Sequence, residues 1–478
     1  MTTLEPRTWR RRAFVAAAIL SASIAYVLFH SPFEVGDTLN TLLRLDVQRL
    51  GDIFSSDLAT TGFVRPMTVV TSKVIFQTAQ VLHVDLFLAY RTFHLACVTV
   101  ILFGVVAVLD VASFETCTLA VLALAIVIGS SAFRQAVAET ELNMKLIMVT
   151  SCVVALLLTS RRRREWTDAA AILLAAYAMF ANELGLLVSV VLITGYLVGF
   201  RCVSRVGVAI VSALLLLYIY LRFVKLNVGL PELAERSSGY GFSIRSPQEL
   251  QEIFGANRLP FYAYNIVSSA MSVLFAEPSN GVFRLVRGLM LDKATAGMIT
   301  ATIASTSATI AIVVHAARRF RAWVAFDLTY DDRLFLVALA LMAANAVISF
   351  PYLKDVTMVP ATTCFAVAIS VALKDLVTEI DLRRVPIGSA AAILVLVAAL
   401  SIGWTLRGFS FYVNMRTQAY KAQADWVSLD EFVRRGQLEM QDERQRGFVE
   451  HIRDEMIGMP VPHVYRDPRW FQDLFTDP

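Results

Sequence analysis

The sequence predicts an all-α polytopic membrane protein with about eleven transmembrane helices, from its composition and from the spacing of its apolar residues. Of 478 residues, 57% are hydrophobic and 17% are charged, whereas a typical soluble domain has about 25% charged residues. The apolar residues fall in long runs, and a bilayer core of about 30 Å requires roughly 20 mostly apolar residues per helix. Several runs are shorter, so roughly ten to thirteen spans agree with the sequence. The candidate spans are residues 13–29, 86–109, 117–128, 146–158, 169–180, 184–200, 206–220, 294–314, 334–350, 356–373 and 387–406.

The distribution of arginine and lysine predicts the topology of these spans. Both residue types accumulate in the short loops on the cytoplasmic side of a membrane. The basic clusters are residues 7–12, 161–164, 201–205, 318–333 and 374–384. A path that keeps these clusters inside places the N-terminus in the cytoplasm and the C-terminus outside. It also places a first outer loop, residues 30–85, and a large outer loop, residues 225–293, on the external surface.

Two further apolar segments are predicted to be helices that do not cross the membrane. Lys73 and Gln77 interrupt the first, residues 66–82, and counting it as a span would move the cluster at 161–164 outside. We therefore expect an amphipathic helix at the membrane surface within the first outer loop. By the same reasoning, residues 261–275 are expected to form an interfacial or re-entrant helix.

The chain is predicted to consist of a transmembrane domain, residues 1–407, and a small extracytoplasmic appendage, residues 408–478. From residue 415 onward the sequence is polar, charged and dotted with aromatic residues. A segment of this length is marginal for an independent core, so we expect it to pack on the membrane domain.

The cysteines and the net charge argue against several classes of protein. The five cysteines are scattered in or beside apolar runs, without CxxC or Cys/His spacing, which argues against structural zinc and a disulfide framework. The net charge of +4 reflects arginines at helix ends, so no nucleic-acid partner is expected. The abundance of Ala, Val and Arg is compatible with a bacterial inner membrane.

Ionisable side chains converge on the predicted outer surface. Charged groups in or near a bilayer are costly, which makes them candidates for function. This set of residues would suit a site where a carboxylate removes a proton from an acceptor while cations bind a phosphate leaving group. The candidates are Glu34, Asp37, Arg65, Arg91, His94, Glu139, Glu141, Lys145, Glu183 and Lys354.

The order and spacing of these residues resemble the GT-C superfamily of polyprenyl-phosphate-dependent glycosyltransferases, especially its aminoarabinose and protein mannosyl transferase branch. That family has an acidic residue in the first outer loop, as in Glu34-Val-Gly-Asp37. A basic-Pro pair then opens an interfacial helix and an Ala-Arg-like pair opens the second span, which Arg65-Pro66-Met67 and Ala89-Tyr90-Arg91 match. The resemblance covers about residues 13–200.

Two later motifs extend the resemblance with departures. Glu139-Thr140-Glu141 matches the second acidic motif, although the family usually has Asp there. Asn182-Glu183-Leu184-Gly185 stands where the family has a Lys-Gly or Lys-Glu element, and this chain lacks the lysine. The first motif is also Gly-Asp where the family often has Asp-Glu.

The resemblance implies inverting transfer of a sugar from a polyprenyl phosphate to a glycan, lipid or protein acceptor at the outer face. Asp37, with Glu34 beside it, would be the catalytic base. The lipid phosphate would be bound by Arg65, Arg91, Lys145 and Lys354. Glu139 or Glu141 would orient the acceptor or ligate a divalent cation, Mg²⁺ or Mn²⁺, which is the one cofactor left open. His94 and Glu183 would have supporting roles, and membrane lipids would be further partners.

Structural interpretations stand beside these roles. Asp37 also fits a solvated loop residue, and Arg65 fits a side chain that extends to lipid headgroups. The acidic pair at 139–141 fits a helix N-terminus, and His94 a histidine buried in the bundle. Lys354 fits an ion pair with its neighbour as well as a phosphate ligand.

Other functional classes agree with the same architecture. A lipid-linked glycan polymerase or ligase usually has catalysis in one large outer loop, and residues 225–293 contain five arginines: Arg236, Arg245, Arg258, Arg284 and Arg287. A flippase or transporter of lipid-linked sugars would favour polar residues at the bilayer midplane and internal repeats, and the sequence shows no such repeat. A non-catalytic scaffold or receptor is a further class.

Overall fold

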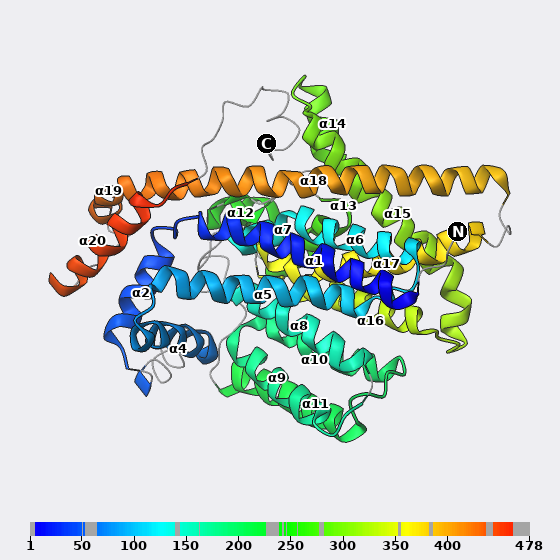
Figure 1. Ribbon diagram of the computed structural model, residues 1–478, viewed down its shortest axis with the longest axis horizontal. Coiled ribbons are helices and arrows are strands. Elements are labelled where there is room, and N and C mark those ends of the chain that lie inside the picture. Colours follow the sequence, from blue (N-terminus) through cyan, green and yellow to red (C-terminus); the bar gives the residue numbers. More distant parts are fainter. Residues whose placement is uncertain are drawn as a thin grey trace.

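The computed structural model is an elongated bundle of helices, most of which run along its long axis (Figure 1). The structure describes residues 5–49, 51–52, 65–138, 144–161, 163–225, 239–240, 243–244, 246–255, 257–276, 282–351, 355–381, 386–435 and 443–461. Regular structure in these ranges is helical except for one antiparallel pairing of Gly239–Tyr240 (β1) with Ser243–Ile244 (β2). The predicted all-α class is confirmed.

Each predicted apolar run coincides with a helical segment, and several helices, α18 above all, extend well beyond the run. The first half contains α1 (Pro6–Phe29), α2 (Asp37–Val47), α4 (Pro66–Leu82), α5 (Leu86–Val108), α6 (Phe114–Gly129), α7 (Ser131–Ala138), α8 (Met144–Ser160), α9 (Thr167–Ala181), the 3-10 helix η1 (Glu183–Gly185), α10 (Leu186–Leu197), α11 (Arg205–Tyr220) and its π-helical end η2 (Leu221–Lys225). The second half contains α12 (Pro247–Phe254), α13 (Arg258–Phe275), α14 (Val282–Met290), α15 (Ala296–Val324), α16 (Tyr330–Ile348), η3 (Asp355–Met358), α17 (Val359–Asp381), α18 (Ile387–Val427), α19 (Leu429–Arg434) and α20 (Glu443–Gly458).

Six helical segments of the described chain are long and apolar enough to cross a membrane: α1, α5, α11 with η2, α15, η3 with α17, and α18. A seventh arises if α6 and α7, which meet at a bend of 60°, are taken as one span. Shorter apolar helices are α8, α9, η1 with α10, and most of α13. This length and apolarity are those of an integral membrane protein.

Local sequence signals explain where several helices begin and end. The Asp85 side chain accepts a hydrogen bond from the Leu88 amide at 2.8 Å and caps α5, and Ser113 caps α6 with a capping box. Pro66 begins α4, as its fixed φ favours the first helical position. His83, with a left-handed φ of 51°, ends the same helix. The helix predicted over residues 66–82 is thus present with those bounds.

Helix α17 lies at the centre of the bundle, since 94% of its apolar window is buried, compared with 17% for α11 and α18. It packs against α6, α15 and α16. Helices α11 and α18 are therefore peripheral, with exposed apolar side chains suited to contact with lipid.

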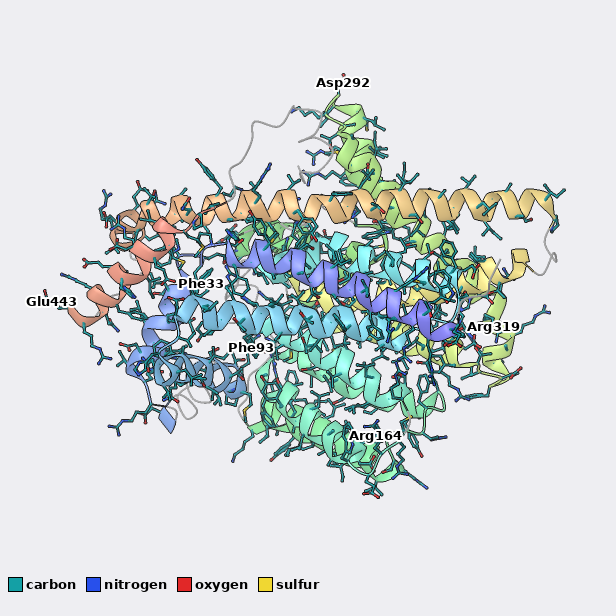
Figure 2. The ribbon with its side chains drawn as sticks, in the orientation of Figure 1. Phe33, Phe93, Arg164, Asp292, Arg319 and Glu443 are labelled. Atoms are coloured by element: carbon teal, nitrogen blue, oxygen red, sulfur yellow. The ribbon has the colours of Figure 1, made fainter. Side chains whose placement is uncertain are left out.

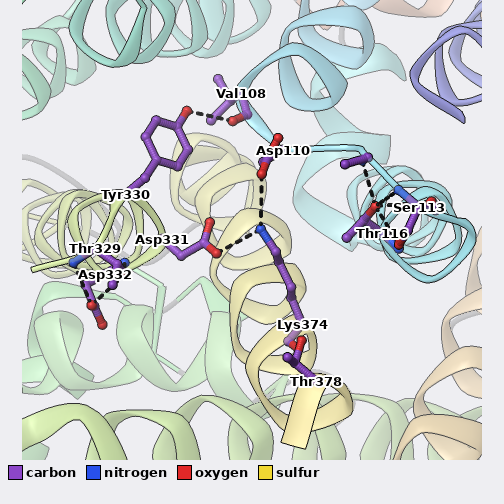
Figure 3. A network of polar contacts seen from close by, with 11 residues as sticks. Val108, Asp110, Ser113, Thr116, Thr329, Tyr330, Asp331, Asp332, Lys374 and Thr378 are labelled. Atoms are coloured by element: carbon purple, nitrogen blue, oxygen red, sulfur yellow. Dashed lines mark hydrogen bonds and ion pairs between the residues drawn. The ribbon is translucent and has the colours of Figure 1, made fainter. Parts of the chain in front are cut away.

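Most of the predicted cytoplasmic clusters gather at one end of the bundle, which we call the basic end. There the Lys374 ammonium contacts the carboxylates of Asp331 at 2.9 Å and Asp110 at 3.5 Å (Figure 3). The Tyr330 hydroxyl donates to the Val108 carbonyl at 2.9 Å in the same network. Figure 2 labels Arg319 at this end and Phe33 and Glu443 toward the other.

The opposite end of the bundle consists of α2, α4, the first turns of α5, the last turns of α18, α19 and α20 (Figure 1). Helix α18 continues without a break through the predicted domain boundary at 407/408 and extends to Val427. Its last turns, α19 and α20 pack on α2, α4 and α5 through one apolar cluster. The cluster is formed by Phe33, Leu39, Leu42, Leu43, Leu45, Val69, Phe76, Phe87, Tyr90, Trp426, Leu429, Val449, Ile452 and Met456.

Candidate functional site

A carboxylate shared by two arginines lies at the opposite end. The Arg65 Nε donates to Glu183 Oε2 at 2.7 Å, and a second nitrogen of the same guanidinium contacts that oxygen. The Arg222 guanidinium donates to Glu183 Oε1 at 2.9 Å and to the Tyr218 hydroxyl at 3.2 Å. Two positive charges and one negative charge leave these three ionised groups with a formal charge of +1.

The cluster is partly buried, and this determines how strongly its charges interact. The exposed fractions of the side chains are 30% for Arg65, 16% for Arg222 and 14% for Glu183. Charges in such surroundings are screened less than charges on an open surface. Arg65 is the most exposed of the three, so its guanidinium is the part of the cluster that an anion would reach first.

Local backbone structure brings these residues together from three elements. Arg65 directly precedes α4, and the Asn182 side chain caps η1 by accepting from the Leu184 amide at 3.0 Å. Gly185 permits the tight packing of η1 against α9, because a Cβ there would lie 1.9 Å from the Ala178 carbonyl oxygen. Arg222 lies in the π-helical end of α11, a conformation that often occurs at functional sites.

Helix α4 is fixed to α9 beside this cluster. The Thr68 hydroxyl donates to the Ala181 carbonyl, and the Thr71 and Tyr177 hydroxyls are 2.9 Å apart. On the other side of α4, the Tyr90 hydroxyl of α5 donates to the Ser72 carbonyl at 2.9 Å. The start of α4 is therefore positioned by two neighbouring helices.

Arg91 is buried and contacts the backbone that follows α1. Only 1% of this residue is exposed, and its guanidinium donates to the carbonyl oxygens of Ser31 and Pro32. It also lies 5.4 and 5.3 Å from the ring centroids of Phe33 and Phe87. In the described structure Arg91 thus binds protein groups, where a phosphate contact was expected.

His94 lies next to Arg91, as its place one turn along α5 predicts. Its Nδ1 is 3.4 Å from the nearest guanidinium nitrogen, and the residue is fully buried. This surrounding agrees with the structural interpretation of His94 as a histidine within the bundle.

The segment that leads to the predicted acidic residues is held from two further directions. The Trp426 Nε1 of α18 donates to the Phe33 carbonyl at 2.5 Å, and the Phe33 amide lies 3.3 Å from the Met456 sulfur of α20. Glu34, the next residue, is half-buried and interacts electrostatically with Arg91. The segment that follows α1 is therefore fixed by α5, α18 and α20 together.

The predicted base, Asp37, is the first residue of α2, and its side chain lies outside the described part of the structure. Gly36 precedes it with a φ of 93°, a conformation that favours glycine. The chain thus turns sharply and begins α2 at the predicted catalytic position.

The remaining predicted residues are only partly described. Lys145 is the second residue of α8 and is half-buried. Glu139, Glu141 and Lys354 lie outside the described residues, and with them the predicted ligands of a divalent cation. Within the described ranges, no three His, Cys, Asp or Glu side chains form a group that could hold a metal ion.

Sequence reasoning missed Arg222 and the role of Lys73. Arg222 follows an apolar run by two residues, where an arginine usually marks the end of a span. Lys73 was noted only as an interruption of α4. Its ammonium donates to the Leu45 carbonyl of α2, and burial lowers the pKa of this amine, partly offset by Asp46.

Comparisons with protein-family models, with characterised proteins and with solved structures find no match to this chain. The functional argument therefore rests on the residues and their geometry.

Proposed function

We propose that this protein is a membrane glycosyltransferase that transfers a sugar from a polyprenyl-phosphate donor to an acceptor, with inversion at the anomeric carbon. The observation that supports this proposal most is the cluster of Arg65, Glu183 and Arg222 at the end of the bundle where α2 begins with Asp37. Guanidinium groups that can bind a phosphate, and a carboxylate at the same membrane surface, are the two elements that such a transfer requires.

The proposal also specifies the number of spans and their orientation, which the apolar helices alone do not establish. It assigns about eleven spans in a GT-C-like fold, with α4 and α13 not crossing the membrane. The basic end faces the cytoplasm, so both the opposite end and the C-terminus are extracytoplasmic, in a bacterial inner membrane.

In the proposed reaction an acceptor oxygen or nitrogen attacks the anomeric carbon while the bond from that carbon to the phosphate oxygen breaks. The acceptor proton passes to the Asp37 carboxylate, and the bonding electrons leave with the lipid phosphate. Arg65 and Arg222 stabilise the charge that develops on the phosphate, since each guanidinium has five N–H donors and fits phosphate oxygens. Glu183 positions both guanidiniums.

The other predicted residues complete the assignment. Glu34 precedes the base by three residues in the chain, and Arg91 with His94 positions the segment that carries both. Glu139 and Glu141 orient the acceptor or ligate Mg²⁺ or Mn²⁺, and Lys145 and Lys354 contact the lipid phosphate. Among these roles, the described contacts support the positioning role of Arg91, which donates to the carbonyls of Ser31 and Pro32.

The test is transfer from a panel of polyprenyl-phosphate sugars by the full-length protein in liposomes. Wild type is compared with Asp37→Asn and Arg65→Ala, and a general base contributes about 10²–10⁴-fold to such a step, so Asp37→Asn should lose at least about 100-fold. The matched control is Asp110→Asn at the basic end, whose carboxylate is 66% exposed; it should retain wild-type transfer.

Two outcomes would overturn the proposal. Full activity in Asp37→Asn would remove the proposed base. No transfer by folded wild-type protein with any donor would favour a glycan polymerase or ligase, or a flippase, which polymer formation and lipid translocation assays in the same liposomes distinguish.

A further inference from the structure

Helix α14 carries an apolar face that is exposed. The apolar positions share one broad side of the helix, because residues three, four, seven and eight apart lie together. Val286, Leu289 and Met290 on this side are 48%, 58% and 80% exposed. A continuous exposed apolar face marks a helix that contacts a membrane surface or another protein. The apolar positions are residues 282, 285, 286, 289 and 290.

The rest of α14 and the turn after it are small or basic. Gly288 packs against the start of α15, where a Cβ on this glycine would lie 3.2 Å from the Met298 sulfur. Arg287 and Lys293 are exposed, and neither side chain has an ion pair or a hydrogen bond within the described part of the chain. An apolar side next to basic side chains is the composition of helices that lie in a membrane interface.

The contact between α15 and α18 fixes the level of this region along the bundle. The Trp404 Nε1 donates to the Ala304 carbonyl at 3.2 Å, and a Cβ on Gly403 would lie 2.8 Å from the Ala304 Cβ. This crossing lies in the last turn of the apolar run of α18, which ends at Leu406 and is followed by Arg407. A spanning helix leaves the hydrocarbon core where its apolar run gives way to charged residues. The two helices therefore cross near the membrane surface on the side of the opposite end.

From this crossing, α14 and the first turns of α15 project past α18 (Figure 1). Figure 2 labels Asp292, which follows α14, at the tip of the projection. The projection runs across the long axis of the bundle, and most helices run along that axis, so it extends along the membrane plane. Because α18 itself exposes apolar side chains to lipid, α14 lies over the lipid that surrounds the bundle.

We propose that α14 is a surface helix that inserts its apolar face into the surrounding lipid leaflet, with Arg287 and Lys293 at the level of the lipid phosphates. Helices of this kind bury their apolar face about 5–10 Å into the headgroup and acyl boundary, and long basic side chains extend to the headgroups. A second copy of the chain is a poorer occupant, because the nine residues of α14 are far fewer than the roughly 20–30 per side of a stable interface. This contact anchors the segment before α15 to the membrane and does not depend on sugar transfer.

The experiment measures the depth of single spin labels in the full-length protein, reconstituted in liposomes of dioleoyl phosphatidylcholine. Oxygen collides mainly with labels in lipid, and a water-soluble nickel complex collides with labels in water. Two exposed positions on α18 calibrate the scale: Val395→Cys in the middle of its apolar run, and Tyr420→Cys about 21 Å past the end of that run. Wild type labelled in parallel gives the signal of the native cysteines, most of which are buried.

The label at Met290→Cys should collide with oxygen and lie about 5–10 Å deep, between the two calibrating positions. The label at Arg287→Cys should be shallower, since it lies at the edge of the apolar face. A collision rate with the nickel complex at Met290→Cys equal to that at Tyr420→Cys would place the face in water and overturn the proposal. Protection from both reagents would also overturn it, and spin–spin broadening would then identify a second copy as the occupant.

A double variant tests whether the apolar face holds the helix in the leaflet. Val286→Asp with Leu289→Asp, introduced into the Met290→Cys protein, should move the label into water. Both side chains are exposed, so the melting temperature should not change. Asp292→Asn at the tip is the matched control and should leave the depth of the label unchanged. An unchanged depth in the double variant would show that contacts within the protein hold α14, and would overturn the proposal.

Discussion

The two ends of the bundle use their charges differently. At the basic end, cations pair with carboxylates across neighbouring helices, as Lys374 does with Asp331 and Arg319 does with Asp332. At the opposite end, the two buried cations of the described chain, Lys73 and Arg91, donate to backbone carbonyl oxygens.

The difference follows from the backbone at each end. The basic end has short connections between helices that cap themselves, so its side chains are available to pair with one another. At the opposite end, the segment between α1 and α2 and the last turn of α2 have buried carbonyls that need donors. The buried cations there stabilise the backbone, which is a framework role. The cluster around Glu183 differs from them because its arginines pair with a side chain and are partly exposed.

The largest predicted effect is that of Arg91→Met. It leaves the Ser31 and Pro32 carbonyls without this donor, at about 1–3 kcal/mol each, so the free energy of unfolding should fall by roughly 2–6 kcal/mol. Thermal unfolding in detergent measures the change. Arg435→Met, in an exposed pair with Glu431, should cost less than about 1 kcal/mol, and an equal loss in both variants would contradict the framework role.

A second prediction compares two shared carboxylates. Asp332 accepts from Arg319 at 2.9 and 2.6 Å and from Trp323 at 2.8 Å. Asp332→Asn and Glu183→Gln should each lower the free energy of unfolding by roughly 2–4 kcal/mol, because each leaves guanidinium groups without their carboxylate. Only Glu183→Gln should also abolish sugar transfer at temperatures where both variants remain folded. Loss of transfer in both would show that the assay reports stability.

Lys374→Gln should have a smaller effect than either carboxylate variant. The lysine is 28% exposed and its partners Asp331 and Asp110 are 32% and 66% exposed, so solvent screens both pairs. We expect a loss of about 0.5–1 kcal/mol that decreases in 1 M salt. Unfolding at low and high salt measures this, and a salt-independent loss would indicate a packing role for the lysine stem.

Periodicity and composition predicted the helices, but not all of their lengths. The run at 387–406 ends where charged residues begin, yet α18 continues to Val427 because its last turns pack on the apolar cluster at the opposite end. The 60° bend between α6 and α7 is also absent from the apolar pattern. Both features depend on contacts between distant segments.

The candidate site was predictable only in part, for a related reason. Arg65 and Glu183 were each singled out as members of separate motifs, but their ion pair joins residues 118 positions apart. Arg222 completes the cluster from the end of another helix. A sequence also cannot distinguish an arginine that binds a phosphate from one that binds carbonyl oxygens, and the carbonyl contacts of Arg91 are visible only in the structure.

The smallest predicted effect is a pH dependence in the contact between α20 and the start of α5. Burial, together with the hydrogen bond and negative charge of Asp85, raises the pKa of Glu455 to about 7. An ordinary Glu titrates near 4.3, so between these values the folded protein binds the extra proton. Stability should therefore fall as pH rises from 5 to 8, by a few tenths of a kcal/mol once screening at this half-exposed group is considered.

Hydrogen exchange of the α20 amides at pH 5 and pH 8 measures this effect, after correction for the intrinsic pH dependence of exchange. Protection should be lower at pH 8 in wild type and equal at both values in Glu455→Gln, which keeps a hydrogen-bond donor but cannot ionise. Asp454→Asn, an exposed neighbour on the same helix, should retain the wild-type pattern. If protection instead increased with pH, α20 would be fixed by groups that bind when ionised, and the opposite end would resemble the basic end.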